Sequence, residues 1–220
     1  MPPKFYDPHA PTDSTSNRLP HWSQQAATYF VTFRLGDSIP GDKLRAHVDA
    51  RRTFEANQGP RPWPPEIERE YYRRFFGKVE TWLDQGAGSC LLRDPENALI
   101  VGETLKFFDR QRYHLHAWVV MPNHVHVLFE TLGDATPGQI LKSWKGYTAR
   151  RINDRLKRTG PLWQRSYFDR MIRDWAHFGR CVRYIVKNPE TAGLSRTGCP
   201  LGTSRLADRF RVAPRSGIAG

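Results

Sequence analysis

The chain contains few cysteines, and their spacing is uninformative for disulfide bonding. Cys90, Cys181 and Cys199 are the three cysteines among 220 residues, and no two of them form a CxxC pair. An odd number of cysteines argues against a framework of disulfides. We therefore expect the protein in a reducing compartment, which places it in the cytoplasm.

Long apolar runs are also missing. The first five residues lack the apolar core of a signal peptide. No apolar run approaches the roughly 20 residues that a membrane-spanning helix needs. We therefore expect no membrane partner.

Acidic residues are in clear deficit. The chain has 34 lysines and arginines against 22 acidic residues, a formal charge of +12. This balance predicts a polyanionic partner, and nucleic acid fits better than a membrane surface. Charge alone is equally compatible with a general association with RNA or with mere solubility.

The composition otherwise describes one globular domain with tails. Hydrophobic residues make up 39% of the chain, enough for a real core. Residues 1–20 are rich in proline, serine and threonine, and we expect a flexible segment without regular structure. Residues 21–195 form the expected domain, and residues 196–220 are expected to be a loose basic tail.

Periodicity predicts both strands and helices within this domain. The expected strands cover residues 28–35, 113–121, 123–130 and 166–172. The expected helices cover residues 42–58, 66–84, 95–108 and 137–157, with a final helix capped by Asp174. Four prolines within residues 59–65 mark a linker. This order of elements predicts an α+β protein.

One predicted strand carries a candidate metal site. His124 and His126 flank a single aliphatic residue, so their side chains lie on the same face of the strand and can bind one divalent ion. His114 and His116 form a second pair with the same spacing, and spacing does not choose between the two pairs.

A candidate nucleophile lies far downstream. Tyr184 and Asn188 are four residues apart near the end of the last predicted helix. A histidine pair, a tyrosine and a basic chain together indicate attack by tyrosine on a nucleic-acid phosphodiester. Tyr167 is the rival nucleophile, although its alternating surroundings are more typical of a strand. No general base is evident in the sequence.

Several short sequence motifs resemble those of a known family. They cover residues 29–35, 121–128, 143–148, 162–169 and 184–194, in family order over roughly residues 18–195. On these words the chain resembles the REP-associated tyrosine transposases, a branch of the single-tyrosine HUH (His-apolar-His) transposases with an IS200-like transposase domain. The resemblance implies the HUH nuclease fold, a ferredoxin- or RRM-like antiparallel sheet with flanking helices.

The resemblance also implies roles for site residues. His124 and His126 follow Met-Pro-Asn, as in the family, and become the metal ligands in place of the other pair. Tyr184 becomes the catalytic nucleophile. Asn188 takes the position of the third metal ligand, where insertion-sequence relatives usually carry glutamine. Imidazole and amide ligands with sites left for water and phosphate suit Mg²⁺ or Mn²⁺.

Asn188 has one feature that conflicts with this role. It precedes Pro189, and a residue before proline is biased away from helical geometry. Asn188 could therefore be a helix cap, which would leave its distance from Tyr184 open.

The implied activity is cleavage and strand transfer on single-stranded DNA. The implied substrates are repeated extragenic palindromes folded as hairpins, and the implied intermediate is a 5′-phosphotyrosine beside a free 3′-hydroxyl. The protein is expected to act as a monomer or a homodimer.

Basic and aromatic residues are candidates for DNA contacts. The expected DNA-binding residues are Lys145, Arg18, Trp22, Arg180, Arg183 and Lys187. Trp22, Tyr29 and Trp163 could stack on unpaired bases, although burial in the core is the commoner role of such residues.

Two other functions remain open at this point. A replication initiator or relaxase of the wider HUH class would usually carry a helicase domain or paired tyrosines, which this chain lacks. A non-catalytic RRM-like binder of nucleic acid would keep the basic surface. It would not need His124, His126, Tyr184 and Asn188 together.

Overall fold

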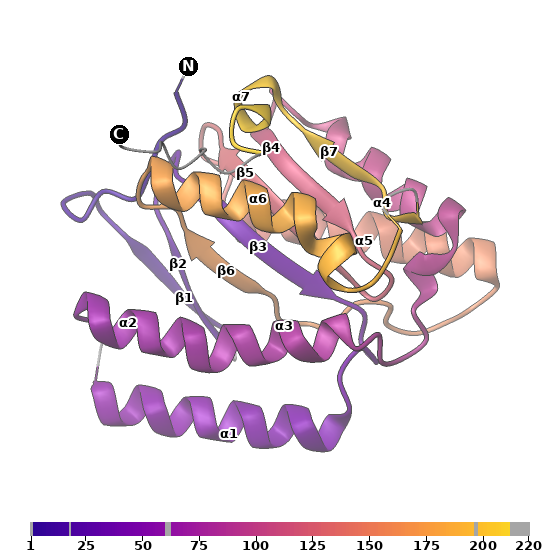
Figure 1. Cartoon of the computed structure of the whole chain (residues 1–220), viewed down its shortest axis with the longest axis horizontal. Helices are drawn as coiled ribbons and strands as arrows, with labels where there is room; N and C mark the ends of the chain where they lie inside the picture. The colour runs from indigo at the N-terminus through magenta and orange to yellow at the C-terminus, as the bar shows by residue number, and fades with distance from the viewer. Residues whose placement is uncertain (1, 18, 60–62, 196–197, 212–220) are drawn as a thin grey trace, which may run out of the picture.

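The structure is a computed structural model of the whole chain, drawn in Figure 1. It describes residues 2–17, 19–59, 63–195 and 198–211, and within residues 13–22 it describes the backbone alone. Arg18 lies outside the described residues, as does the side chain of Trp22. No helix in the described ranges is both long and apolar enough to cross a membrane.

An antiparallel sheet of five strands forms the centre of the fold. Its strand order is β6-β3-β5-β4-β7. The strands are β3 (Thr28–Arg34), β4 (Tyr113–Val120), β5 (His124–Thr131), β6 (Phe168–Met171) and β7 (Leu201–Thr203). Without β7, the chain order of the strands across the sheet is 4-1-3-2, with helices after the first and third strands. This is the ferredoxin- or RRM-like topology, so the predicted fold class is confirmed.

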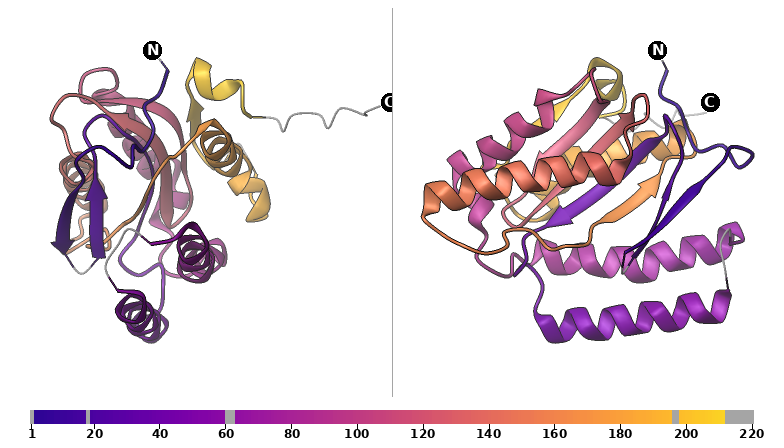
Figure 2. Two further views of the ribbon diagram at one scale, coloured as in Figure 1. Left: turned by 90° about the vertical axis from the view of Figure 1, so that its left-hand side faces the viewer. Right: turned by 180° about the vertical axis from the view of Figure 1, so that it is seen from behind.

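Helices cover both faces of this sheet (Figures 1 and 2). Helices α4 (Pro95–Phe107) and α5 (Pro137–Leu156) pack on one face, and α6 (Trp175–Thr191) packs on the other. All three begin at side-chain caps, provided by Asp94, Thr136 and Asp174. These caps satisfy backbone N–H groups that have no partner within the helix.

A helical insertion separates β3 from β4. It consists of α1 (Gly41–Gln58), α2 (Pro65–Tyr71), the π-helix η1 (Tyr72–Phe76), α3 (Gly77–Asp84) and the short 3₁₀ helix η2 (Leu91–Arg93). Figure 1 shows α2, η1 and α3 as one continuous rod alongside α1. The single helix expected for residues 66–84 therefore contains a π-helical segment.

The π-helix lets neighbouring aromatic residues contact different parts of the protein. Phe75 contacts α1, where its ring lies 5.6 Å from that of His47. Phe76 contacts the sheet, where its ring lies 5.9 Å from that of Phe30. The wider π-helical turn thus lets two consecutive residues pack in two directions, one against α1 and the other against the sheet.

The larger core lies between the sheet and helices α4 and α5. Trp144 and Tyr113 are buried there, and the Trp144 Nε1 donates a hydrogen bond of 3.0 Å to the Tyr113 hydroxyl. Trp163 and Tyr29 are also buried. Burial in the core accounts for both rings, which are 6% and 0% exposed.

Both ends of the chain contain more regular structure than the sequence predicted. Strands β1 (Asp13–Asn17) and β2 (Leu19–Ser23) pair with each other, although residues 1–20 were expected to lack regular structure. In the expected loose tail, β7 pairs with β4, and a short helix α7 (Arg205–Asp208) follows. All three of these strands are short, so their periodicity is too brief to recognise.

The position of β7 depends on a glycine beside a tryptophan. Trp118 of β4 lies against Gly202, and a Cβ atom at residue 202 would come within 2.5 Å of the Trp118 Nε1. The paired strand therefore tolerates no side chain at this position.

We expect Gly202→Ala to lower the free energy of unfolding by about 1–3 kcal/mol, because the new methyl group overpacks the contact with Trp118. Urea denaturation measures the change. Gly198→Ala is the matched control, since a Cβ atom there has nothing within 4 Å. Equal stabilities of the two variants would contradict the close contact.

Candidate metal and tyrosine site

His124 and His126 lie side by side at the start of β5. Both are fully buried on the sheet face that α6 covers. Their Nε2 atoms are 3.0 Å apart, so the two rings converge on one point as the strand alternation predicted.

Asn123 fixes the orientation of the first ring. Its amide nitrogen donates to the carbonyl oxygens of Leu83 and Ala87, at 3.2 and 3.1 Å. Its amide oxygen therefore faces His124 and accepts a hydrogen bond of 2.7 Å from Nδ1. With the proton on Nδ1, the Nε2 of His124 has a free lone pair, the state that a metal ligand needs.

Thr32 of β3 holds the second ring from the neighbouring strand. Its hydroxyl lies 2.8 Å from the His126 Nδ1, directly across the register of β3 and β5. Burial raises the pKa of Glu80, and a hydrogen bond with the same hydroxyl partly offsets this rise, so we assign the Thr32 proton to the carboxylate. The hydroxyl oxygen then accepts from Nδ1, and His126 also directs a free Nε2 into the site.

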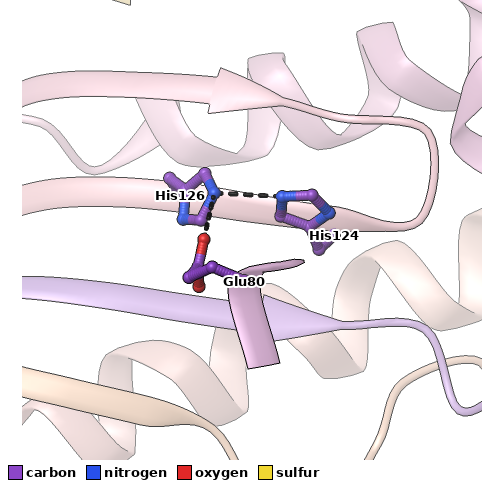
Figure 3. A group of neighbouring side chains, drawn as sticks. All are labelled: Glu80, His124 and His126. Atoms are coloured by element: carbon purple, nitrogen blue, oxygen red, sulfur yellow. Dashed lines mark hydrogen bonds and ion pairs between the residues drawn. The ribbon is translucent and has the colours of Figure 1, made fainter. Parts of the chain in front are cut away.

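Glu80 completes the group, and sequence analysis did not find it. Figure 3 shows its carboxylate reaching from α3 to His126, where Oε2 lies 3.2 Å from Nε2. Glu80 precedes His124 by 44 residues and belongs to the inserted helices. No local motif marks it, so only the packing of α3 against the sheet reveals it.

Tyr184 of α6 contacts the same carboxylate. Its hydroxyl donates a hydrogen bond to Glu80 Oε2, the atom that also faces His126. The Tyr184 ring packs edge-on against His126, with ring centroids 5.2 Å apart. The structure therefore brings together the predicted nucleophile and both predicted histidines.

Asn188 lies one turn after Tyr184 within the same helix. Helix α6 continues through Pro189 to Thr191, so Asn188 is a helical residue and not the end of the helix. Its side chain is buried, and its one recorded interaction is with the Tyr184 hydroxyl, where it partly offsets the raised pKa of that group. Neither polar atom makes a hydrogen bond of ordinary geometry among the described residues. A buried carboxamide with unfilled hydrogen-bonding capacity is costly, which is consistent with a ligand that completes it.

Burial keeps both histidines neutral. It lowers the pKa of His124 to about 3. It also lowers the pKa of His126 well below its usual range, and the neighbouring His124 adds to the effect. Neutral imidazoles are the form that binds metal.

Burial has the opposite effect on the two acidic groups. It raises the pKa of Glu80 to about 8, and the nearby Asp84 adds to the rise. It also raises the pKa of Tyr184 well above its usual range, and the negative charge of Glu80 acts in the same direction. Both groups therefore resist ionisation unless a positive charge is present.

The donor set fits a divalent cation. Glu80, His124 and His126 each direct one ligand atom into a group whose members lie within 4.8 Å of one another. An octahedral ion at about 2.1 Å places adjacent ligand atoms about 3.0 Å apart, which matches the separation of the two Nε2 atoms, 3.0 Å. This group could hold a metal ion.

The rival residues lie elsewhere. His116 pairs with Glu130 at 3.7 Å near the other end of β4. Tyr167 packs into the core beneath α5, on the opposite face of the sheet from His126. Neither His116 nor Tyr167 belongs to the group around Glu80.

Lys145 has a structural contact that its predicted DNA role did not include. Its ammonium donates hydrogen bonds of 2.6 and 2.9 Å to the carbonyl oxygens of Gln164 and Arg165. Burial, with the nearby charge of Arg34, lowers the pKa of Lys145 to about 8. Lys145 thus ties α5 to the loop that leads into β6.

The other predicted DNA-binding residues are spread along α6. Arg180 and Lys187 are exposed, and Arg183 is half-buried. All three remain candidates for DNA contacts. Arg18 and the side chain of Trp22 lie outside what the structure describes.

A known protein family matches the part of the chain that holds most of this site. Residues 103–188 match the family model described as "Transposase IS200 like". The matched segment contains both histidines, Tyr184 and Asn188, and it excludes Glu80. This segment is less than half of the chain, and its similarity to IS200-like transposases agrees with the resemblance inferred from the sequence.

Two solved structures are similar to the chain at low identity. One is a REP-associated tyrosine transposase bound to a REP hairpin, with 15% identity and a TM-score of 0.45, covering 83% of this chain and 77% of that one. The other is a putative transposase from Deinococcus radiodurans R1, with 15% identity and a TM-score of 0.30, covering 76% and 93%. No curated protein matches the chain.

We expect Lys145→Met to destabilise the fold by about 1–3 kcal/mol, because two backbone carbonyl groups lose a charged donor. Urea denaturation measures the loss. Lys142→Met on the same helix is the control, since Lys142 is exposed. An unchanged stability for Lys145→Met would show that these hydrogen bonds do not stabilise the fold. The DNA contact predicted from the sequence would then be the remaining role of Lys145.

Proposed function

We propose that the protein is a metal-dependent endonuclease and strand transferase that acts on single-stranded DNA. The contact that carries the proposal is the hydrogen bond from the Tyr184 hydroxyl to Glu80, whose carboxylate also faces His126. A nucleophile, an acidic group and two metal-binding imidazoles meet in one buried cluster. A protein that only binds nucleic acid has no need for this arrangement.

His124, His126 and Glu80 would hold the metal, and Asn188 is the candidate fourth ligand. Imidazole, carboxylate and amide oxygen suit Mn²⁺ or Mg²⁺. When bound, the ion would neutralise charge on the phosphate that is attacked. Burial and the nearby charge of Asp84 both raise the pKa of Glu80, and a cation would counter both effects.

Tyr184 would act as the nucleophile. Its hydroxyl oxygen attacks the phosphorus atom, and the bond from phosphorus to the 3′-oxygen breaks. Glu80 is in contact with the hydroxyl and is placed to accept its proton. The same proton can pass to the departing 3′-oxygen, which leaves a 5′-phosphotyrosine and a free 3′-hydroxyl.

The covalent intermediate makes strand transfer possible without an external energy source. The phosphotyrosine bond conserves the energy of the phosphodiester, so a 3′-hydroxyl from another end can reverse the reaction. We propose REP-type hairpins as substrates, because the words around His124, Trp163 and Tyr184 resemble the REP-associated branch.

We expect Tyr184→Phe to abolish covalent attachment to DNA and to leave hairpin affinity nearly unchanged. The substitution removes one hydroxyl group and preserves the ring that packs on His126. A labelled single-stranded hairpin is incubated with the protein and Mn²⁺, and adducts that survive denaturation are counted.

Tyr167→Phe is the matched control for this experiment and should keep full adduct formation. Adducts that persist in Tyr184→Phe but vanish in Tyr167→Phe would exchange the roles of the two tyrosines. Wild-type protein that binds hairpins and never forms an adduct would favour the non-catalytic alternative.

We expect Glu80→Gln to weaken Mn²⁺ binding at least tenfold, because the site loses its one charged ligand while the hydrogen bond from Tyr184 can persist. Electron paramagnetic resonance counts free Mn²⁺ during a titration, without any need for activity. The double variant His124→Ala and His126→Ala should lose measurable binding.

Asn188→Ala tests whether Asn188 or Glu80 is the third metal ligand beside the two histidines. A larger loss of affinity in Asn188→Ala than in Glu80→Gln would make the carboxamide the main ligand and Glu80 only the partner of Tyr184. Cleavage that continues in a chelator, after removal of metal is verified, would exclude metal dependence altogether.

A further inference from the structure

A second concave site lies on the outer side of the helical insertion. It is a cavity of about 250 Å³ between α1 and the rod formed by η1 and α3. Figures 1 and 2 both show α1 running alongside this rod. The residues that matter for its chemistry are Lys43, His47, Arg74, Phe75, Lys78 and Trp82.

The walls of this cavity combine aromatic rings with positive charge. Phe75 and Trp82 provide the apolar surface. The Lys78 ammonium lies 5.3 Å from the centre of the Trp82 ring, and the Arg74 guanidinium lies 5.4 Å from that of Phe75. Lys43 adds a third cation, and no acidic residue lines the cavity.

His47 supplies a polar atom that the protein leaves without a partner. Its side chain is only 5% exposed, and its ring is packed edge-on by both Phe75 and Trp82. The His47 Nε2 is buried and has no hydrogen-bond partner among the described residues. Such an atom is costly, and because it has no exposed surface, a ligand in the cavity reaches it only if the covering rings shift.

The charge state of His47 further restricts the chemical class of ligand that the cavity can bind. Burial, followed by the charges of Arg51 and Lys78, lowers the pKa of His47 to about 4. The ring is therefore neutral at pH 7 and suits a neutral polar partner. The anionic part of a ligand would instead meet the lysines and the arginine at the rim.

A nucleotide has this combination of properties. Its base is a flat, neutral ring, which fits the aromatic walls. Its phosphate is an anion that suits the cationic rim. The volume of the cavity, about 250 Å³, equals that of about eight water molecules at roughly 30 Å³ each, which is enough for one base.

We propose that this cavity binds an unpaired base of the DNA substrate, with its phosphate held by Lys43 and Lys78. The proposal rests on the proposed function, because it takes single-stranded DNA as the ligand. Helix α3 carries Glu80 on its inner side and Lys78 with Trp82 on the side facing the cavity. A strand that passes over α3 would thus have one base fixed near the metal site.

Salt dependence tests the phosphate part of the proposal. The probe is a labelled DNA hairpin with a ten-nucleotide single-stranded thymidine flank, titrated with full-length protein at several salt concentrations. Lys43→Ala with Lys78→Ala should reduce the slope of log affinity against log salt by about 1.4, or about 0.7 for each contact.

The control for this arm removes the same charge elsewhere. Lys106→Ala with Arg110→Ala changes the last turn of α4 and the turn that follows it, and should keep the wild-type slope. Equal reductions in both double variants would show a general effect of charge and would overturn the cavity as a binding site.

Abasic substitution tests the base. Wild-type protein should show one flank position at which removal of the base raises Kd by about five- to a hundredfold, the loss of one stacked base. Trp82→Leu keeps apolar bulk and should abolish that penalty. A flank without any sensitive position, or a penalty unchanged in Trp82→Leu, would overturn the proposal.

Adduct formation separates this inference from the proposed function. The cavity variants should still form the Tyr184 adduct at saturating DNA, and Tyr184→Phe should keep the abasic penalty. A penalty without any adduct in wild-type protein would leave the cavity standing and refute the chemistry. An adduct without an abasic penalty would support the proposed chemistry and refute the cavity as a base-binding site.

Discussion

The structure depends on placing a cluster of polar groups inside a protein core. His124, His126 and Glu80 are almost completely removed from water, and each would be costly there alone. They are held by contacts that come from three parts of the chain: Asn123 beside the first histidine, Thr32 from β3, and Tyr184 from α6. Remaining strain is concentrated at the point where the lone pairs of both imidazoles and the carboxylate converge. A divalent cation would relieve it, so the same burial that makes the cluster costly would favour binding of a metal.

The sequence predicted the parts of the site that obey a local period. Strand alternation placed His124 and His126 on one face. The position of Asn188 relative to Tyr184 stayed open because Pro189 follows it, and the structure shows both residues within one helix. Glu80 follows no such rule. It comes from a helix that a π-helical segment joins to its neighbour, and its contact with His126 depends on tertiary packing alone. A single sequence contains no signal for that contact.

The same distinction between local periodicity and tertiary packing explains which elements of the fold the sequence predicted. Long strands and capped helices were predictable, because each offers many residues to one period and a recognisable cap. Strand β7 has three residues and is stabilised by pairing with β4, so nothing within it indicates a strand. Lys145 shows the limit of reasoning from charge: the residue lies in a family word, yet its ammonium binds two carbonyl groups within the protein. A positive charge in a basic chain is thus a candidate for DNA contact only after its own partners have been counted.

Helix α3 joins the two sites proposed for this chain. One side places Glu80 against His126 and Tyr184, and another places Lys78 and Trp82 along the cavity beside α1. A rigid helix transmits position well, because its side chains are fixed relative to one another by the backbone hydrogen bonds. Any ligand that moves α3 therefore changes the distance between Glu80 and the tyrosine it orients. The insertion lies outside the segment matched to the transposase family, residues 103–188. The matched segment thus contains His124, His126 and Tyr184, the residues proposed as metal ligands and nucleophile, whereas Glu80, which contacts both His126 and Tyr184, comes from the insertion.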